Sequence, residues 1–272
     1  MARQPVSEPP SLGVEWLTLL LILGCYAAWI TLVTCHTLIG WPMAALGLIP
    51  LVVIHSSLQH EAIHAHPTNR AWLNEALVFP SLWMVMPWRR YRDTHLTHHR
   101  TGRLTDPLED PESHYLWPDQ WETLPRWAQR LLTLQGSLIG RVTLGPIVLV
   151  VRIITADWRE YRQGNKTIPQ AWAMHLTSIT LVTLVLAFAG VPLWLYALTV
   201  VWPATSILMV RGYVEHRPAE RQRERSVLVE AGPMTSLLFL NNNLHALHHQ
   251  RPNLAWYELA PLYRRHRDRL IV

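Results

Sequence analysis

The stretch SLQHEAIHAHP, residues 57–67, places His60 and His64 four positions apart, with Glu61 between them. This is the H-E-x-x-H pattern of zinc proteases, in which two histidines on one helical turn bind Zn²⁺ and the glutamate acts as general base. The same spacing also serves other metals. The rest of the sequence therefore has to decide which metal and which chemistry this stretch carries.

Long apolar runs on both sides of this stretch predict an integral membrane protein. Half of the 272 residues are hydrophobic and only 16% are charged. Four runs approach the roughly 20 residues that cross a bilayer as a helix, at 16–35, 38–58, 171–189 and 191–210. Because the connection within each pair is short, we expect two helical hairpins. Two further apolar stretches, 71–88 and 131–156, contain prolines or arginines and are expected to lie at the interface or to enter the membrane partway.

The distribution of positive charge predicts the orientation. Of 24 lysines and arginines, one precedes residue 70, and the hairpin tips near Gly40 and Gly190 carry none. By the positive-inside rule, segments 59–167 and 211–272 are then cytoplasmic, and residues 1–272 form one membrane domain. The basic runs lie next to the spans, so we expect them to contact lipid headgroups. No nucleic-acid-binding motif accompanies them, and nucleic acid is not an expected partner.

Two more histidine clusters follow the first. The segments THLTHHR and NNNLHALHHQ both contain H-x-x-H-H, a spacing that places three imidazoles on one side of a helix. Side chains of this kind are costly to keep next to a bilayer without a function. The repeated spacing therefore predicts a metal site formed by His60, His64, His95, His98, His99, His245, His248 and His249.

The number of ligands favours iron over zinc. A catalytic zinc takes three protein ligands, which would leave at least five of these histidines without a role. Eight imidazoles suit two metal ions with open positions, and imidazole is a ligand of iron. We therefore expect two non-haem irons with O₂ as co-substrate. In that case Glu61 orients a ligand imidazole instead of acting as a general base.

The motifs HEAIH, HLTHH and HALHH, spread over two hairpins, resemble those of the membrane fatty acid desaturase and hydroxylase superfamily. The resemblance implies an all-α membrane protein with four transmembrane helices and a cytosolic helical cap that carries three histidine boxes. It adds His216, in YVEHRP, as a ninth ligand. It also implies that polar side chains near the boxes orient the ligands: the candidates are Glu61, Asp106, Asp110 and Glu112, together with Asn241, Asn242 or Asn243.

The resemblance implies oxidation of a lipid-like chain with O₂ and two electrons. The sequence contains no haem-binding segment or ferredoxin-like cysteine set, so we expect a separate electron carrier, such as a ferredoxin or rubredoxin, and its reductase. A fatty acyl desaturase or hydroxylase in a bacterial inner membrane is the leading hypothesis. A carotenoid ketolase or hydroxylase is the close alternative, and a small polar ring compound is a third substrate class. An intramembrane zinc protease and a non-catalytic metal carrier are the alternatives from other classes.

Overall fold

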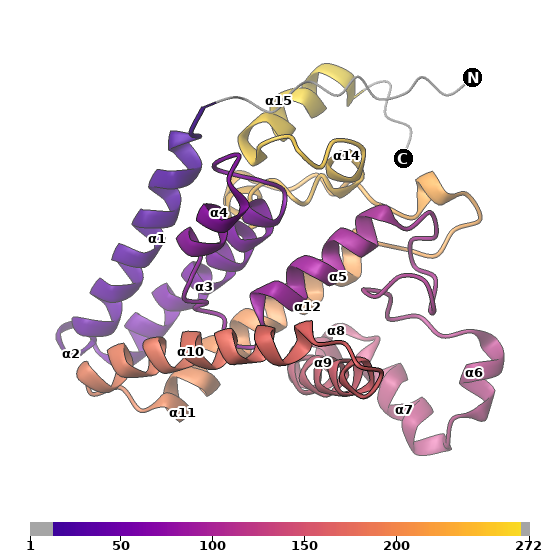
Figure 1. Ribbon diagram of the computed structural model, residues 1–272, viewed down its shortest axis with the longest axis horizontal. Helices are drawn as coiled ribbons and strands as arrows, with labels where there is room; N and C mark the ends of the chain where they lie inside the picture. Colours follow the sequence, from indigo (N-terminus) through magenta and orange to yellow (C-terminus); the bar gives the residue numbers. More distant parts are fainter. Residues whose placement is uncertain (1–12, 268–272) are drawn as a thin grey trace.

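The computed structural model describes residues 13–267, which are mainly helical and contain no β-strand (Figure 1). The remaining ends of the predicted 1–272 domain lie outside the described residues. The helices in chain order are α1 (Trp16–Thr34), α2 (His36–Ile39), α3 (Trp41–Ile63), α4 (Ala71–Leu77), α5 (Trp88–Arg100), α6 (Pro118–Thr123), α7 (Arg126–Gln135), α8 (Leu138–Thr143), α9 (Gly145–Arg162), α10 (Thr167–Phe188), α11 (Leu193–Tyr196), the π-helical turn η1 (Ala197–Val201), α12 (Trp202–Glu215), the 3₁₀ turn η2 (Gln222–Glu224), α13 (Pro233–Leu238), α14 (His245–Gln250) and α15 (Trp256–His266).

Four helices are long and apolar enough to cross a membrane, as predicted. They are α1, α3, α10 and the continuous stretch Leu193–Glu215, which joins α11, η1 and α12. The second and fourth continue past the predicted ends at 58 and 210, to Ile63 and Glu215. A helix does not have to end where its sequence turns polar, because its backbone hydrogen bonds are satisfied internally. These extensions carry His60 and Glu215 to the site described below.

Both predicted hairpin tips are occupied by a glycine with positive φ. Gly40 has φ +80° and immediately precedes α3, while Gly190 has φ +75° and lies two residues after α10. Residues other than glycine rarely adopt this backbone conformation without strain. The glycines therefore allow the chain to reverse direction within a few residues.

Helix α3 lies at the centre of the fold and contacts α1, α12, α4 and α5. Figure 1 shows α1 beside α3, with α5, α14 and α15 near the end of α3 that carries His60. Buried hydrogen bonds tie the spans together. Trp29 Nε1 donates to Tyr196 Oη at 3.0 Å, and Tyr196 Oη donates to the carbonyl of Leu82 at 3.1 Å. The spans thus form a fixed scaffold with the histidine-bearing elements at one end.

Of the two shorter apolar stretches, which the sequence predicts as helices at the interface, only the second is helical over most of its length. Before α5 begins at Trp88, only Ala71–Leu77 of the first stretch is helical. Leu82 and Trp83 are buried in the core, where Trp83 Nε1 donates to Thr205 of α12 at 2.9 Å. Prolines at 80 and 87 prevent one continuous helix. The second stretch is divided into α7, α8 and α9. The break before α8 is capped by Ser137, whose hydroxyl accepts from the backbone N–H of Gly140.

Candidate metal centre

Nine histidines from four parts of the chain converge in two neighbouring clusters. In each cluster one ring nitrogen per residue lies within 4.8 Å of all the others. The five-histidine cluster consists of His60, His64, His95, His99 and His248. The four-histidine cluster consists of His98, His216, His245 and His249. All nine histidines predicted from the sequence are therefore brought together.

Each H-x-x-H-H box is divided between the two clusters. On α5, the first and last histidines of the box, His95 and His99, join the five-histidine cluster, and His98 joins the other. On α14 the arrangement is reversed, since His248 alone joins the five-histidine cluster. Residues i and i+4 differ by about 40° around a helix, whereas i+3 lies on the other side of residue i. Each helix therefore supplies both clusters.

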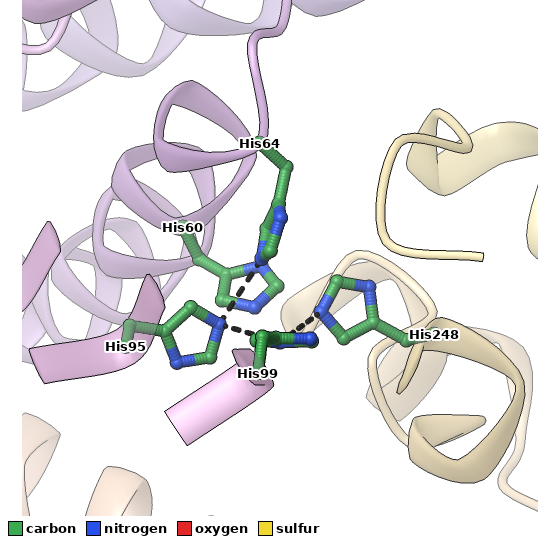
Figure 2. A group of neighbouring side chains, drawn as sticks. All are labelled: His60, His64, His95, His99 and His248. Carbon is green, nitrogen blue, oxygen red and sulfur yellow. Dashed lines mark hydrogen bonds between the residues drawn. The ribbon is translucent and has the colours of Figure 1, made fainter. Parts of the chain in front are cut away.

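Figure 2 shows the rings of the five-histidine cluster pointing toward a common centre. His95 Nε2 lies 3.1 Å from His64 Nε2 and 3.0 Å from His99 Nε2, and His99 Nε2 lies 3.1 Å from His248 Nε2. His60 is in the last turn of α3, and His64 is the first residue after that helix rather than part of it. Their rings nevertheless pack with centroids 4.9 Å apart. The Nε2 atom of His60 is buried without a protein partner among the described residues.

In the four-histidine cluster, the hydrogen-bond partners indicate that two Nδ1 atoms carry protons. His98 Nδ1 faces the Asp110 carboxylate at 2.8 Å, and His216 Nδ1 faces the carbonyl of Arg225 at 3.1 Å. Both oxygens can only accept, so both Nδ1 atoms donate, and the Nε2 atom of each neutral ring bears a lone pair. Yet His98 Nε2 and His216 Nε2 lie 3.0 Å apart. In neutral rings two lone pairs at this distance would repel each other, so a proton or a metal ion shared between them fits the geometry.

The spacing fits a metal ion. Two nitrogens that each lie about 2.1 Å from one ion, at right angles to each other, are about 3.0 Å apart. In the four-histidine cluster His245 Nε2 lies 2.9 Å from His216 Nε2 and 3.1 Å from His249 Nε2. These distances recur around both clusters. The ring nitrogens therefore form two sets of converging donors that suit transition metals such as iron.

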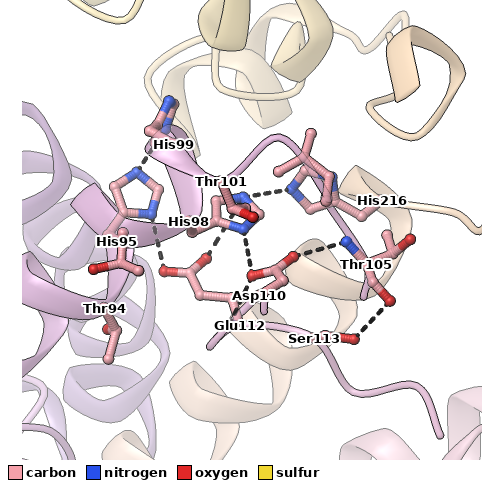
Figure 3. Close-up of polar contacts among 12 residues, drawn as sticks. Thr94, His95, His98, His99, Thr101, Thr105, Asp110, Glu112, Ser113 and His216 are labelled. Carbon is pink, nitrogen blue, oxygen red and sulfur yellow. Dashed lines mark hydrogen bonds and ion pairs between the residues drawn. The ribbon is translucent and has the colours of Figure 1, made fainter. Parts of the chain in front are cut away.

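Two carboxylates of the loop after α5 contact the Nδ1 atoms of two ligand imidazoles, on the side of each ring that faces away from its cluster (Figure 3). Besides the Asp110–His98 pair, His95 Nδ1 lies 3.0 Å from Glu112 Oε1. The loop is itself fixed, because Asp110 Oδ2 accepts from the backbone N–H of Thr105 at 2.8 Å and the Ser113 hydroxyl donates to the carbonyl of Thr105. Such contacts set the tautomer and ring orientation of a metal ligand and raise its basicity.

Comparison with known proteins decides the family. The family described as "Fatty acid desaturase" matches residues 35–271, which is most of the chain and includes all nine histidines. This chain belongs to the fatty acid desaturase family. A search of curated proteins finds no match. Family membership confirms the resemblance inferred from the three boxes and favours an oxidoreductase over a peptidase or a metal carrier.

Burial makes most of the imidazoles of this family member neutral. It lowers the pKa of His99 to about 2 and of His216 to about 4, with neighbouring imidazoles acting in the same direction. The pKa values of His245 and His248 also lie well below the usual value, for the same two reasons. For His98 burial is outweighed by the carboxylates of Glu112 and Asp110, which raise its pKa. A neutral ring is the form that binds a metal.

The structure places Asn242, one of the predicted orienting residues, against a ligand histidine and adds Glu215 and Arg211 behind it. Asn242 accepts from His245 Nδ1 at 3.2 Å and donates to Glu215 Oε1 at 2.9 Å. Glu215 in turn lies 3.2 Å from Arg211 Nε. Glu215 is adjacent to His216 in sequence, yet it supports the box on α14. The only signal was an acidic residue within YVEHRP, which did not say what it contacts.

Other predicted orienting residues lie differently. Asp106 accepts from the backbone N–H groups of Leu108 and Glu109, so it shapes its own loop instead of contacting a ligand histidine. Asn241 and Asn243 donate to the carbonyls of Trp256 and Val229. Asp106 thus bonds locally within its own turn, whereas Asn241 and Asn243 hold backbone segments that are distant in sequence.

Glu61 was expected either to orient a ligand imidazole or to act as a general base. Its Oε2 accepts from the backbone N–H of Trp256 at 3.1 Å, and its Oε1 is 3.7 Å from His60 Nδ1. The side chain is 4% exposed. Glu61 thus ties α15 to the last turn of α3 behind His60, on the Nδ1 side of that ring.

Proposed function

We propose that this chain is an O₂-dependent di-iron oxidase that desaturates or hydroxylates a fatty acyl or similar lipid-like chain. The observation that carries the proposal is the pair of imidazole clusters, in which ring nitrogens of different residues approach one another at about 3 Å in two neighbouring groups. Two bound irons would supply the activation of O₂ and the oxidation of an unactivated C–H bond. A separate carrier protein, such as a ferredoxin or rubredoxin with its reductase, would deliver the electrons.

The chain's own residues would hold, orient and shield the centre. Each cluster would bind one iron through inward-facing nitrogens, while Asp110, Glu112 and Asn242 keep the outward nitrogens of three ligands protonated. His98 is fully buried and His245 and His248 are 2% exposed. Exclusion of water from such a site prevents side reactions of an oxidising centre.

A cavity of about 470 Å³ next to the four-histidine cluster supports an apolar substrate. It lies between α3, α8, α12 and α13, and its size is within the range of small-molecule sites. Glu215 and Asn243 line it, which places it beside the Glu215–Asn242–His245 network. Most other lining residues are apolar, among them Ile49, Val142, Pro203, Ile207, Val210, Val214 and Phe239. We propose that the hydrocarbon chain lies here.

We further propose that the centre faces the cytoplasm of a bacterial cell, from the inner membrane. The support is the sequence: the two polar segments that bear the boxes hold nearly all lysines and arginines, and the hairpin tips hold none. The ends of α3 and α12 that reach the site then share one side with α5 and α14.

The substrate assignment is tested by filling the cavity. Ile207→Trp places a large ring in the proposed chain site, so we expect O₂-dependent product to fall at least about tenfold with iron content unchanged. Ile154→Trp is the matched control, because Ile154 is 51% exposed on α9 and should leave turnover unchanged. Product is measured by lipid and pigment profiling of a host that expresses each variant. A changed pigment profile with unchanged fatty acids would assign the carotenoid alternative, and equal product from both variants would remove the cavity from the proposal.

A further inference from the structure

A buried arginine outside the metal centre forms no ion pair with any of the described residues. Arg141 of α8 is 3% exposed, and its Nε has no hydrogen-bond partner within residues 13–267. None of the ion pairs formed within that range involves it. Its guanidinium lies over the ring of Tyr213 of α12, 3.6 Å from the ring centroid. A cation–π contact offsets only part of the cost of burying a charge, and a buried guanidinium normally also has an anionic or hydrogen-bonding partner.

Two more basic groups lie at the same place. Arg152 of α9 donates to the carbonyl of Ser113, and the next residue, His114, packs against Tyr115 and Tyr213 with ring centroids 4.3 and 5.4 Å away. His114 Nε2 is buried without a protein partner in the described part of the chain. Burial, followed by the charges of Arg141 and Arg152, lowers the pKa of His114 to about 4. The side chains of Arg141, Arg152 and His114 therefore lie close to one another.

The neighbouring carboxylate is already engaged. Asp110 is close enough to influence both His114 and Arg152, but its two oxygens accept from His98 and from the backbone of Thr105. The region between Arg141, Arg152 and His114 thus keeps a net positive charge with free N–H donors. An anion is the partner that these groups can bind.

The position of these groups beside a membrane span indicates which kind of anion could bind to them. Helices α8 and α9 contact α12 and expose apolar side chains, including Leu138 at 67%, Ile139 at 71%, Val151 at 53% and Ile154 at 51%. An exposed apolar face of this extent beside a span suits lipid. Tyr213 is two residues from the end of that span at Glu215, the depth at which tyrosines meet lipid headgroups.

We propose that Arg141, Arg152 and His114 form a binding site for the phosphate group of an anionic membrane lipid. Guanidinium edges present paired N–H donors that match phosphate oxygens, and a neutral imidazole protonated on Nε2 adds one more. Basic pockets of this kind between membrane helices bind lipid headgroups. The site is separate from the metal centre, so it does not depend on the proposed oxidase activity.

The test measures lipid retention by the full-length protein in detergent, by native mass spectrometry during titration with phosphatidylglycerol or phosphatidylcholine. The wild type should retain phosphatidylglycerol in preference to phosphatidylcholine. Arg152→Gln, which alters an exposed side chain and should leave the fold intact, should weaken phosphatidylglycerol binding at least about tenfold. Arg141→Gln should do the same if it folds. Arg159→Gln, an exposed arginine on the same helix α9, is the matched control and should bind like the wild type.

A second titration, with inorganic phosphate, distinguishes a lipid headgroup from a soluble phosphate as the source of the anion. Competition by phosphate that requires Arg152, with tighter binding of phosphatidylglycerol, supports a lipid phosphate site. Equal binding of both ligands through Arg152 supports the phosphate chemistry and assigns a soluble source. Equal retention of both lipids by the wild type, or Arg152→Gln binding phosphatidylglycerol as tightly as Arg159→Gln does, would overturn the proposal.

Discussion

Asp110 is the residue whose carboxylate most clearly supports a ligand. One oxygen accepts from His98 Nδ1 at 2.8 Å and the other from the backbone N–H of Thr105 at 2.8 Å. Asp110→Asn keeps only one of these acceptors, so the ring of His98 should lose its fixed orientation. We expect iron affinity to fall about 10- to 100-fold. Competition with a chelator measures this.

Asp106→Asn is the matched control in the same loop. A single oxygen of Asp106 accepts from Leu108 and Glu109, and asparagine retains that oxygen. Iron affinity should therefore stay at the wild-type value. A loss as large as that of Asp110→Asn would mean that both substitutions act by disrupting the loop, and would contradict the specific role of Asp110.

The sequence could predict the residue types of the centre better than their individual contacts. The spacing within the three boxes predicted that eight histidines converge, and the family resemblance added His216 as the ninth. The structure brings all nine together; that they bind iron stays a prediction. The acidic loop was predicted as a whole, but which of its carboxylates reach a histidine depends on the turn that Asp106 shapes. The role of Glu215 was not predicted, because its partner Asn242 is distant in sequence and is brought near only by the fold.

At the scale of helices, the backbone conformation of Gly40 leads to a prediction about the first hairpin. Its φ of +80° and ψ of 144° suit glycine, and an added Cβ would meet only Pro42 at 3.9 Å. Gly40→Ala should therefore destabilise the protein by about 1–3 kcal/mol through backbone strain alone. Thermal unfolding in detergent is the measurement.

Gly24→Ala in the middle of α1 provides the comparison. Nothing lies within 4 Å of the added Cβ, and the backbone there is helical. Alanine should leave stability unchanged or raise it by up to about 1 kcal/mol. An equal loss of stability in both variants would show that the hairpin turn does not require glycine.

Hydrophobic runs and glycines predicted the four spans, since a membrane helix is defined by length and apolarity. Hydropathy alone does not give their polar extensions. The spacing of His60 and His64 predicted the extension of the second span, which ends at Ile63. The extension of the fourth span, Arg211 to Glu215, was not predicted. The division of each box between two clusters was also not predictable. It requires knowing that α5 and α14 present their histidines to each other from opposite sides.

At the scale of the whole molecule, the proposed orientation can be tested with reporter fusions. Fusions that end at Gly40 and Gly190 should place the reporter outside the cytoplasm, because both are tips of hairpins without positive charge. A fusion at Gly164, in the connection between α9 and α10, should place it inside. Any of the three reporting the other side would contradict the positive-inside assignment.

The central claim is that the two histidine clusters each bind one iron, and metal analysis of the purified full-length protein tests it most directly. The wild type should contain about two irons per chain, and His248→Ala and His98→Ala, which each remove a ligand from a different cluster, should both contain fewer. One zinc per chain in the wild type, or two irons retained in both variants, would contradict the account.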